Sequence, residues 1–399
     1  MADAMSQSDG KAATSRSRVS SIDFLRGLVI VIMALDHVRD FTTAARIDPL
    51  DPNETNLALY ATRWITHFCA PVFVFLAGVS AGLQRLGGRT PADLSRFLLT
   101  RGLWLIFLEL TIVFMGWTFL PPIGVAFLQV IWAIGVSMVI LAALVRLPVA
   151  AIAAFGLALV VGHNLFDGVG PEPFSQAQGA GDVIAMLLHA PGFVGEPLRG
   201  PFIAYPIVPW VGVMALGYVA ADMFRWTETR RRKWLLIGGA ALIAGFLILR
   251  AGNFYGDPSG WTAQETAIKS VMSFFSTTKY PPSLLFLMMT LGPAAIILAL
   301  AENWRGRAFD FFVTFGRVPL FFYVLHIYLA HLIGVALGLY QGHDLFSLTI
   351  VMFNPPEGFG VGLPGVYAFW LLVVTMLYPA CRWFAGVKRR STKWWMAYF

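Results

Sequence analysis

Residues 21–40 read SIDFLRGLVIVIMALDHVRD, an apolar run that carries charged residues near both ends. If this run is an α-helix, one narrow stripe along it holds Asp23, Arg26, Ile30, Met33, His37 and Asp40. Arg26 and His37 are 11 residues apart, a rise of about 16 Å along a helix. Ionisable groups at the centre of a membrane helix cost about 2.5–3.5 kcal/mol each and normally face a bundle interior or a wet cavity. The stripe therefore predicts a polar passage through a helical bundle.

Single residues of this stripe also have plainer interpretations. Asp23 and Arg26 would serve as interfacial anchors, and their spacing allows an i, i+3 ion pair. His37 would serve as a capping residue in the outer headgroup layer. The alignment of the whole set on one stripe favours the passage.

The composition of the chain is typical of a membrane protein. Hydrophobic residues make up 57% of the 399 residues and charged residues 13%, and the mean hydropathy is +0.69. A soluble domain is usually about 45–50% apolar and about 25% charged, and a membrane-spanning helix needs about 20 mostly apolar residues. We predict an all-α bundle of about ten transmembrane helices, at 21–40, 63–84, 97–119, 122–145, 147–164, 201–222, 234–251, 281–301, 311–338 and 363–385.

The basic residues predict the orientation of this bundle. With both termini in the cytoplasm, 20 of the 29 Lys and Arg fall in inner segments, as the positive-inside rule requires. The net charge of +7 is thereby explained by short membrane loops, and no nucleic-acid partner is expected. The longest connections lie on the outer side, where we expect the substrate to be handled, at 40–62, 165–200, 252–280 and 339–362.

One membrane domain, 21–386, is predicted between two tails. The cytoplasmic tail 1–20 is expected to be disordered and is not a cleavable signal peptide. The tail 387–399 is basic and aromatic and is expected to anchor at the interface. The oligomeric state is left open.

Polar residues in other predicted helices point to the same passage. His326 lies in the middle of VTFGRVPLFFYVLHIYLAH (313–331), where it is either functional or a buried neutral histidine with one hydrogen bond. His331 lies about 140° further around that helix, so the two histidines are not expected to share a metal ion. Arg63 and His67 share a face at the outer end of another helix, and Lys279 and Tyr280 precede a Pro-Pro pair at an outer mouth.

No metal site is predicted. Cys69 and Cys381 lie far apart and are read as packing residues. His163 and His189 belong to outer connections and have no partner pattern.

Five blocks of the sequence resemble a known family. SIDFLRG, APVFVFLAGVSAG, YPIVPWVGVMALGY, KYPPSLLFLMMTLGP and GRVPLFFYVLHIYLAH occur in the order seen in bacterial relatives of the heparan-α-glucosaminide N-acetyltransferase catalytic domain. LRGLVIVIMALDH resembles the first core helix of the transmembrane acyltransferases, in which an essential polar residue follows the Arg by eleven positions. His37 has this spacing. The lysosomal enzyme's own catalytic His lies in the following outer loop, and residues 41–62 contain no His to match it.

The resemblance implies an acyl transfer across the bilayer. Acetyl-CoA would be the cytosolic donor, and a sugar hydroxyl or amine, such as a cell-envelope carbohydrate, would be the acceptor at the outer face of a bacterial inner membrane. His37 would be the general base, or else would carry the acyl group covalently. Asp36 or the better-spaced Asp40 would orient its ring, and His326 would stabilise the oxyanion or hold the acceptor.

The remaining predicted site residues fall into two groups. The donor side comprises Asp23, Arg26, Arg101 and Arg317. The acceptor side comprises Arg63, His67, Lys279, Tyr280 and Tyr323. A small-solute transporter or channel that uses the same polar stripe is the alternative function.

Overall fold

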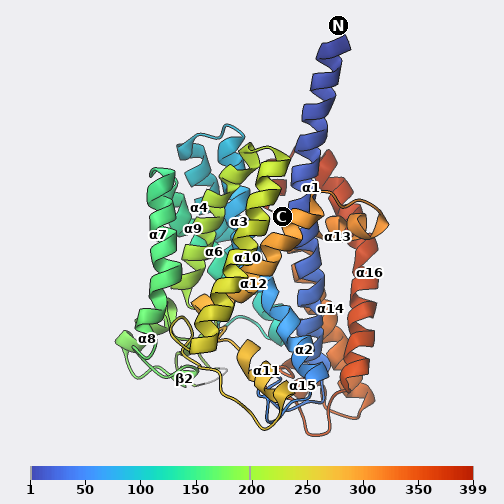
Figure 1. The fold of residues 1–399 in the computed structure, drawn as a ribbon. Coiled ribbons are helices and arrows are strands. Elements are labelled where there is room, and N and C mark those ends of the chain that lie inside the picture. Colours follow the sequence, from blue (N-terminus) through green and yellow to red (C-terminus); the bar gives the residue numbers. More distant parts are fainter. Residues whose placement is uncertain (1, 197–198, 399) are drawn as a thin grey trace.

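The computed structural model describes residues 2–196 and 199–398, with side chains described from residue 20 onward except at 397. Long helices run roughly parallel to one another, and the N-terminus projects from one end of the bundle (Figure 1). The α-helices are α1 Ala2–Thr42, α2 Leu57–Ile65, α3 Cys69–Leu86, α4 Pro91–Leu108, α5 Phe114–Thr118, α6 Val130–Leu144, α7 Val149–Gly162, α8 Ala180–Leu188, α9 Ile207–Ala220, α10 Glu228–Gly252, α11 Ala267–Phe275, α12 Leu284–Ala301, α13 Arg307–Arg317, α14 Pro319–Tyr340, α15 Leu345–Thr349 and α16 Leu363–Arg390.

The chain is a multi-pass integral membrane protein. Among the described residues, eight helical segments are long and apolar enough to cross a bilayer. Each of the ten predicted runs overlaps a helix of the structure. The two runs outside the eight are α1, which carries too many charged residues, and α6, which has only 15 residues. The eight spans are Leu57–Leu86, Pro91–Thr118, Val149–Phe166, Ile207–Arg225, Glu228–Gly252, Leu284–Ala301, Pro319–Tyr340 and Leu363–Arg390.

Proline and glycine explain where the predicted boundaries were wrong. The run predicted to start at residue 122 becomes helical only at Val130, because Pro121, Pro122 and the positive φ of Gly124 hold the chain in an irregular turn. The run predicted as 311–338 is two helices, α13 and α14, which meet at Val318 in front of Pro319. A residue that precedes proline is driven out of the helical region.

Helix α1 lies at the centre of the bundle and packs against α3, α13, α14 and α16. Its contact with α13 depends on two glycines. A Cβ at Gly27 would lie 1.8 Å from the carbonyl oxygen of Phe312, and a Cβ at Gly316 would lie 1.8 Å from that of Asp23. Only glycine lets the two backbones approach so closely, and this approach places the polar stripe of α1 inside the protein.

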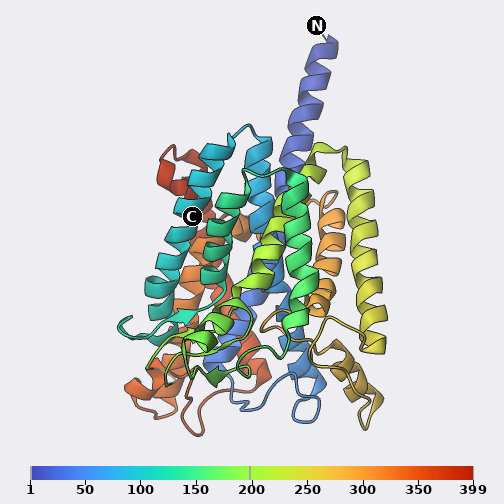
Figure 2. The ribbon, with the colours of Figure 1, turned by 90° about the vertical axis from the view of Figure 1, so that its left-hand side faces the viewer.

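A layer of short elements covers the bundle end opposite the N-terminus. It includes α2, α8, α11 and α15 (Figure 1) and a sheet of two-residue strands, which the sequence did not predict. The strands are β1 Phe127–Leu128, β2 Ser175–Gln176, β3 Gly192–Phe193 and β4 Phe202–Ile203. Their order is β1-β4-β3-β2. The β3–β4 pair is antiparallel, and the other two pairs are parallel. Seen from the side, the strands and loops form one layer below the long helices (Figure 2).

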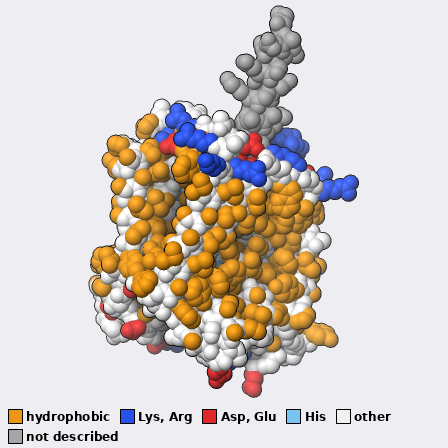
Figure 3. All heavy atoms as spheres, viewed as in Figure 1, with side chains coloured by type: hydrophobic (Ala, Val, Ile, Leu, Met, Phe, Trp, Pro, Cys, Tyr) orange, Lys and Arg blue, Asp and Glu red, His pale blue; other side chains and the backbone are white. Residues whose placement is uncertain are grey.

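The surface has two clearly different zones. Apolar side chains cover the middle of the face in Figure 3, and Lys and Arg gather at the end from which the N-terminus projects. Large apolar side chains are exposed on several of the long helices, among them Phe107, Leu157, Ile248 and Leu371. Such a belt is stable only against lipid, so the bilayer is the surrounding solvent of these helices.

Candidate functional site

The site is centred on a pair of histidines from α1 and α14. His37 Nδ1 lies 2.7 Å from His326 Nε2, and His326 Nδ1 lies 3.0 Å from the carbonyl oxygen of Phe322, one turn earlier in α14. A carbonyl only accepts, so Nδ1 of His326 must carry the proton and its Nε2 must offer a lone pair. His37 therefore donates from Nδ1, and in this neutral pair its own lone pair resides on Nε2.

His37 borders a cavity of about 440 Å³ near the end of α1 that lies opposite the N-terminus, and we call it the outer cavity. Side chains from α1, α2, the 277–283 segment and the sheet line this outer cavity. Its polar and aromatic lining includes Asp36, His37, Arg39, Asp40, Arg63, Trp117, Tyr205, Lys279 and Tyr280. The Trp117 ring meets the His37 ring edge to face, with centroids 4.8 Å apart. The imidazole thus has an aromatic wall on one side and a polar space on another.

Ion pairs fix the acidic residues beside His37. Asp36 forms an ion pair with Arg39 at 2.8 Å and accepts a hydrogen bond from Arg63 at 2.6 Å, and Asp40 accepts from Arg39 at 2.7 Å. The sequence predicted that Asp40 or Asp36 orients the His37 ring. In the structure, His326 instead contacts Nδ1 of that ring. Helical spacing suggested Asp40 but gave no information about the residue that α14 brings across the bundle.

The pKa values of two tyrosines that line the outer cavity are shifted in opposite directions. Burial raises the pKa of the Tyr205 phenol well above its ordinary value. Burial acts in the same direction on Tyr280, but the charges of Lys279 and Arg63 outweigh it and lower the Tyr280 pKa. The Lys279 ammonium lies 5.0 Å from the centre of the Tyr280 ring. Tyr280 is therefore the stronger hydrogen-bond donor of the two toward a ligand in the outer cavity.

A second cavity, of about 230 Å³, lies toward the end of α1 that carries Arg26. Four basic residues line this inner cavity: Arg26, Arg101, Arg317 and Lys388. Arg26 donates to Asp23 at 3.1 Å, as the spacing predicted, and to Ser80 Oγ at 3.0 Å. Asp23 also lies 3.9 Å from Arg317. The inner cavity is thus strongly cationic and suits an anion such as a phosphate.

The two cavities share part of their lining. Met33, Phe73 and Val130 border both of them. Met33 belongs to the predicted stripe of α1, between Arg26 and His37. These three apolar side chains therefore lie between the outer and inner cavities and form an apolar constriction on the way from one to the other.

Two residues predicted on the acceptor side lie elsewhere. His67 is fully buried, packs 5.3 Å from the Phe286 ring and has no hydrogen-bond partner among the described residues. Tyr323 borders the inner cavity and meets the His326 ring edge to face at 5.5 Å. The i, i+4 pairing of Arg63 with His67 failed as a guide because the helix changes to a 3₁₀ turn at Thr66–Phe68, which rotates His67 away from the cavity.

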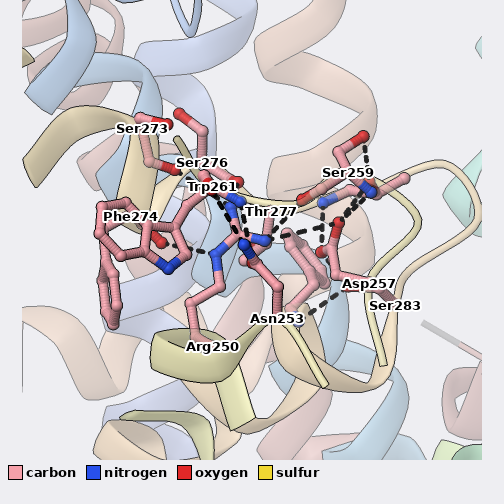
Figure 4. A network of polar contacts seen from close by, with 12 residues as sticks. Arg250, Asn253, Asp257, Ser259, Trp261, Ser273, Phe274, Ser276, Thr277 and Ser283 are labelled. Atoms are coloured by element: carbon pink, nitrogen blue, oxygen red, sulfur yellow. Dashed lines mark hydrogen bonds and ion pairs between the residues drawn. The ribbon is translucent and has the colours of Figure 1, made fainter. Parts of the chain in front are cut away.

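A buried arginine holds the segment that carries Lys279 and Tyr280. Arg250, only 1% exposed, donates to the carbonyl oxygens of four residues (Figure 4): Ser259 at 2.6 Å, Phe274 at 2.9 Å, Ser273 at 3.0 Å and Ser276 at 2.5 Å.

Asp257, 3.9 Å from Arg250, extends this frame. Its carboxylate accepts from the Thr278 amide at 2.9 Å and from the Ser283 hydroxyl at 2.7 Å. Thr278 and Ser283 bracket Lys279 and Tyr280 in the chain. The network therefore restrains the part of the outer cavity wall that Lys279 and Tyr280 form.

Several lining residues were missed in the sequence. In the sequence, Lys388 is one of several basic residues in the C-terminal tail, and Trp117 is one of many aromatic residues. Neither position indicated a role in a site. Arg250 lies in the last turn of α10, and Asp257 lies in the connection that follows it, where no motif marks it. Only the charge of Arg250 within an apolar run signalled a buried role.

Comparison with known proteins gives one family. The sequence model described as "Heparan-alpha-glucosaminide N-acetyltransferase, catalytic" matches residues 18–252, more than half of the chain. The matched range contains Arg26, His37 and Arg63, whereas His326 lies beyond it. No curated protein matches the chain.

Proposed function

The chain belongs to the heparan-alpha-glucosaminide N-acetyltransferase catalytic family, and we propose that it moves an acetyl group from acetyl-CoA in the inner cavity to a sugar hydroxyl or amine in the outer cavity. The rim of Lys and Arg in Figure 3 supports a cytoplasmic position for the inner cavity and for both termini. A bacterial inner membrane suits this arrangement, with the acceptor supplied by the cell envelope.

The observation that carries this proposal is the hydrogen-bond geometry of the histidine pair. His37 donates from Nδ1 to His326, so in its neutral form it keeps a lone pair on Nε2, and it borders the outer cavity. A neutral imidazole with a fixed tautomer is suited to general-base catalysis. When His37 takes up a proton, both ring nitrogens become donors, and the bond to His326 becomes charge-assisted.

The inner cavity suits the donor. Coenzyme A carries phosphates at one end and a thioester at the end of a long arm. Arg26, Arg101, Arg317 and Lys388 would hold the phosphates, and the arm would pass Met33 toward His37. The rise of about 16 Å between Arg26 and His37 is the span that the arm has to cover.

The reaction then follows from these positions. The acceptor heteroatom attacks the thioester carbonyl carbon while His37 Nε2 removes its proton. The C–S bond breaks, and the proton passes from His37 to the departing thiolate. The products are the acetylated acceptor and free coenzyme A. Arg63, Lys279 and Tyr280 surround the outer cavity and would bind the acceptor and the developing negative charge.

Purified protein incubated with [acetyl-¹⁴C]acetyl-CoA and cell-envelope glycans tests this proposal. We expect label on the glycan with the parent protein. We expect at least a hundredfold less with His37→Ala, because general-base catalysis contributes about 10²–10⁴-fold. His343→Gln, in an outer loop, is the matched control and should retain parental activity.

The same experiment separates the alternatives. Label held by the protein without acceptor, and lost in His37→Ala, would indicate an acetyl-histidine intermediate. Full transfer by a folded His37→Ala protein would eliminate His37 as the base. Absence of any transfer, together with solute flux into liposomes, would indicate the transporter or channel.

A further inference from the structure

Two histidines and an aspartate meet in the outer layer, away from both cavities described above. His163 and Asp167 lie at the end of the α7 span, and His189 is the residue that ends α8. One potential ligand atom from each of the three side chains lies within 4.8 Å of the others. His163 and His189 are 26 residues apart in the chain, so their sequence spacing gave no sign of this cluster.

The distances suit a small divalent cation. His163 Nδ1 lies 3.1 Å from His189 Nε2, and His189 Nε2 lies 3.7 Å from Asp167 Oδ1. Ligands about 2.0–2.1 Å from a tetrahedral zinc ion are separated by about 3.3–3.4 Å. These two separations lie on either side of that value, and the third lies within 4.8 Å, so the three side chains would have to close around the ion by rotation.

A neighbouring group already orients one of these ligands. The Asn164 amide donates to Asp167 Oδ2 at 2.7 Å, which leaves Oδ1 on the side of His189. Hydrogen bonds of this kind to ligating carboxylates are a regular feature of metal sites.

We propose that His163, Asp167 and His189 bind a zinc ion or a similar first-row divalent cation, with a fourth position open to water. Two imidazoles and one carboxylate favour such a cation over magnesium or calcium, which prefer oxygen ligands. His189 and Asp167 side chains are 12% and 18% exposed, so the ion has a route from the outer solution.

The ion would join three parts of the outer layer. Asn164, beside two of the ligands, also accepts from the Leu284 amide at 2.9 Å, which ties the cluster to the start of α12. His189 precedes strand β3, which pairs with β4, and Phe202 of β4 borders the outer cavity. Metal binding would therefore stiffen one wall of that cavity, whatever reaction the cavity supports.

The test is metal binding by the full-length protein, purified through an affinity tag without histidines, stripped with EDTA and titrated with ZnCl₂ alone. We expect one equivalent of bound zinc and an unfolding temperature that rises with zinc concentration. Cobalt(II) in place of zinc should give the visible absorption of a tetrahedral site. His189→Gln and Asp167→Asn should lose the bound equivalent and the cobalt spectrum, whereas His343→Gln, which removes a histidine outside the cluster, should retain both.

Two results would overturn the proposal. One is a parent protein that gains neither a zinc equivalent nor stability in the titration. The other is unchanged zinc binding in the two ligand variants, which would assign the ion to another site. The cobalt spectrum needs no variant, so a variant that fails to fold leaves the proposal open to refutation. Activity is not the readout, so the outcome is independent of the proposed acetyl transfer.

Discussion

His326→Leu should slow acetyl transfer without preventing folding, because it removes the acceptor of the His37 Nδ1 proton. In the ground state this neutral hydrogen bond contributes about 0.5–1.5 kcal/mol, and beside the imidazolium formed during the reaction about 1.5–3 kcal/mol. The difference, about 1–1.5 kcal/mol, corresponds to about tenfold in rate. Losing the fixed tautomer costs about another 1 kcal/mol, so the total of about 2–2.5 kcal/mol should lower kcat about 30–70-fold.

The assay is initial rate against acetyl-CoA concentration, with a pH profile for each variant. His326→Gln keeps an oxygen acceptor and should recover part of the lost kcat, with KM for acetyl-CoA little changed in both variants. His331→Gln is the control on the same helix, since His331 contacts the carbonyl oxygens of Gly116 and Leu348 and not His37. That change should lower the unfolding temperature and leave kcat close to the parental value. Parental turnover in folded His326→Leu protein would show that the histidine pair is only structural.

Three further outcomes are expected. Arg26→Ala should weaken acetyl-CoA binding about tenfold, because one charge-assisted phosphate contact contributes about 1.5 kcal/mol; equal affinities by calorimetry would remove Arg26 from the donor site. Arg250→Met leaves four carbonyls without their donor and should lower the free energy of unfolding by about 3–5 kcal/mol, measured by thermal unfolding in detergent; an unchanged unfolding temperature would contradict the frame in Figure 4. In an alkaline titration followed by tyrosinate absorbance, the parent should show a component that titrates below the usual tyrosine pKa of about 10, because Lys279 and Arg63 lower the Tyr280 pKa. Tyr280→Phe should lose this component. Its persistence in the variant would assign it to another tyrosine.

The long helices and the stripe of α1 could be predicted because local rules govern them. Each apolar run of membrane length overlaps a helix, and the spacing of Arg26, Met33 and His37 on α1 predicted the stripe that borders the two cavities. Helical periodicity is a property of one segment, so no knowledge of the neighbouring segments was needed.

Contacts between distant segments could not be predicted in this way. Asp40 was preferred as the partner of His37 because it is near in sequence, but α14 brings His326 to that nitrogen. The strands are too short to show an alternating pattern, and His163 and His189 meet only because α7 and α8 end at the same level. Long connections carry little periodic information, so their folding depends on tertiary contacts such as those of Arg250.

The apolar constriction of Met33, Phe73 and Val130 has a consequence for the cell's energy supply. A wet channel joining the two sides of an energised membrane would let protons run down a potential in which each charge is worth about 2.3 kcal/mol per 100 mV. These three side chains therefore have to keep water out whenever no substrate fills the gap, as hydrophobic gates do in channels. Replacing them by small residues would remove this barrier and open a path for water between the two cavities.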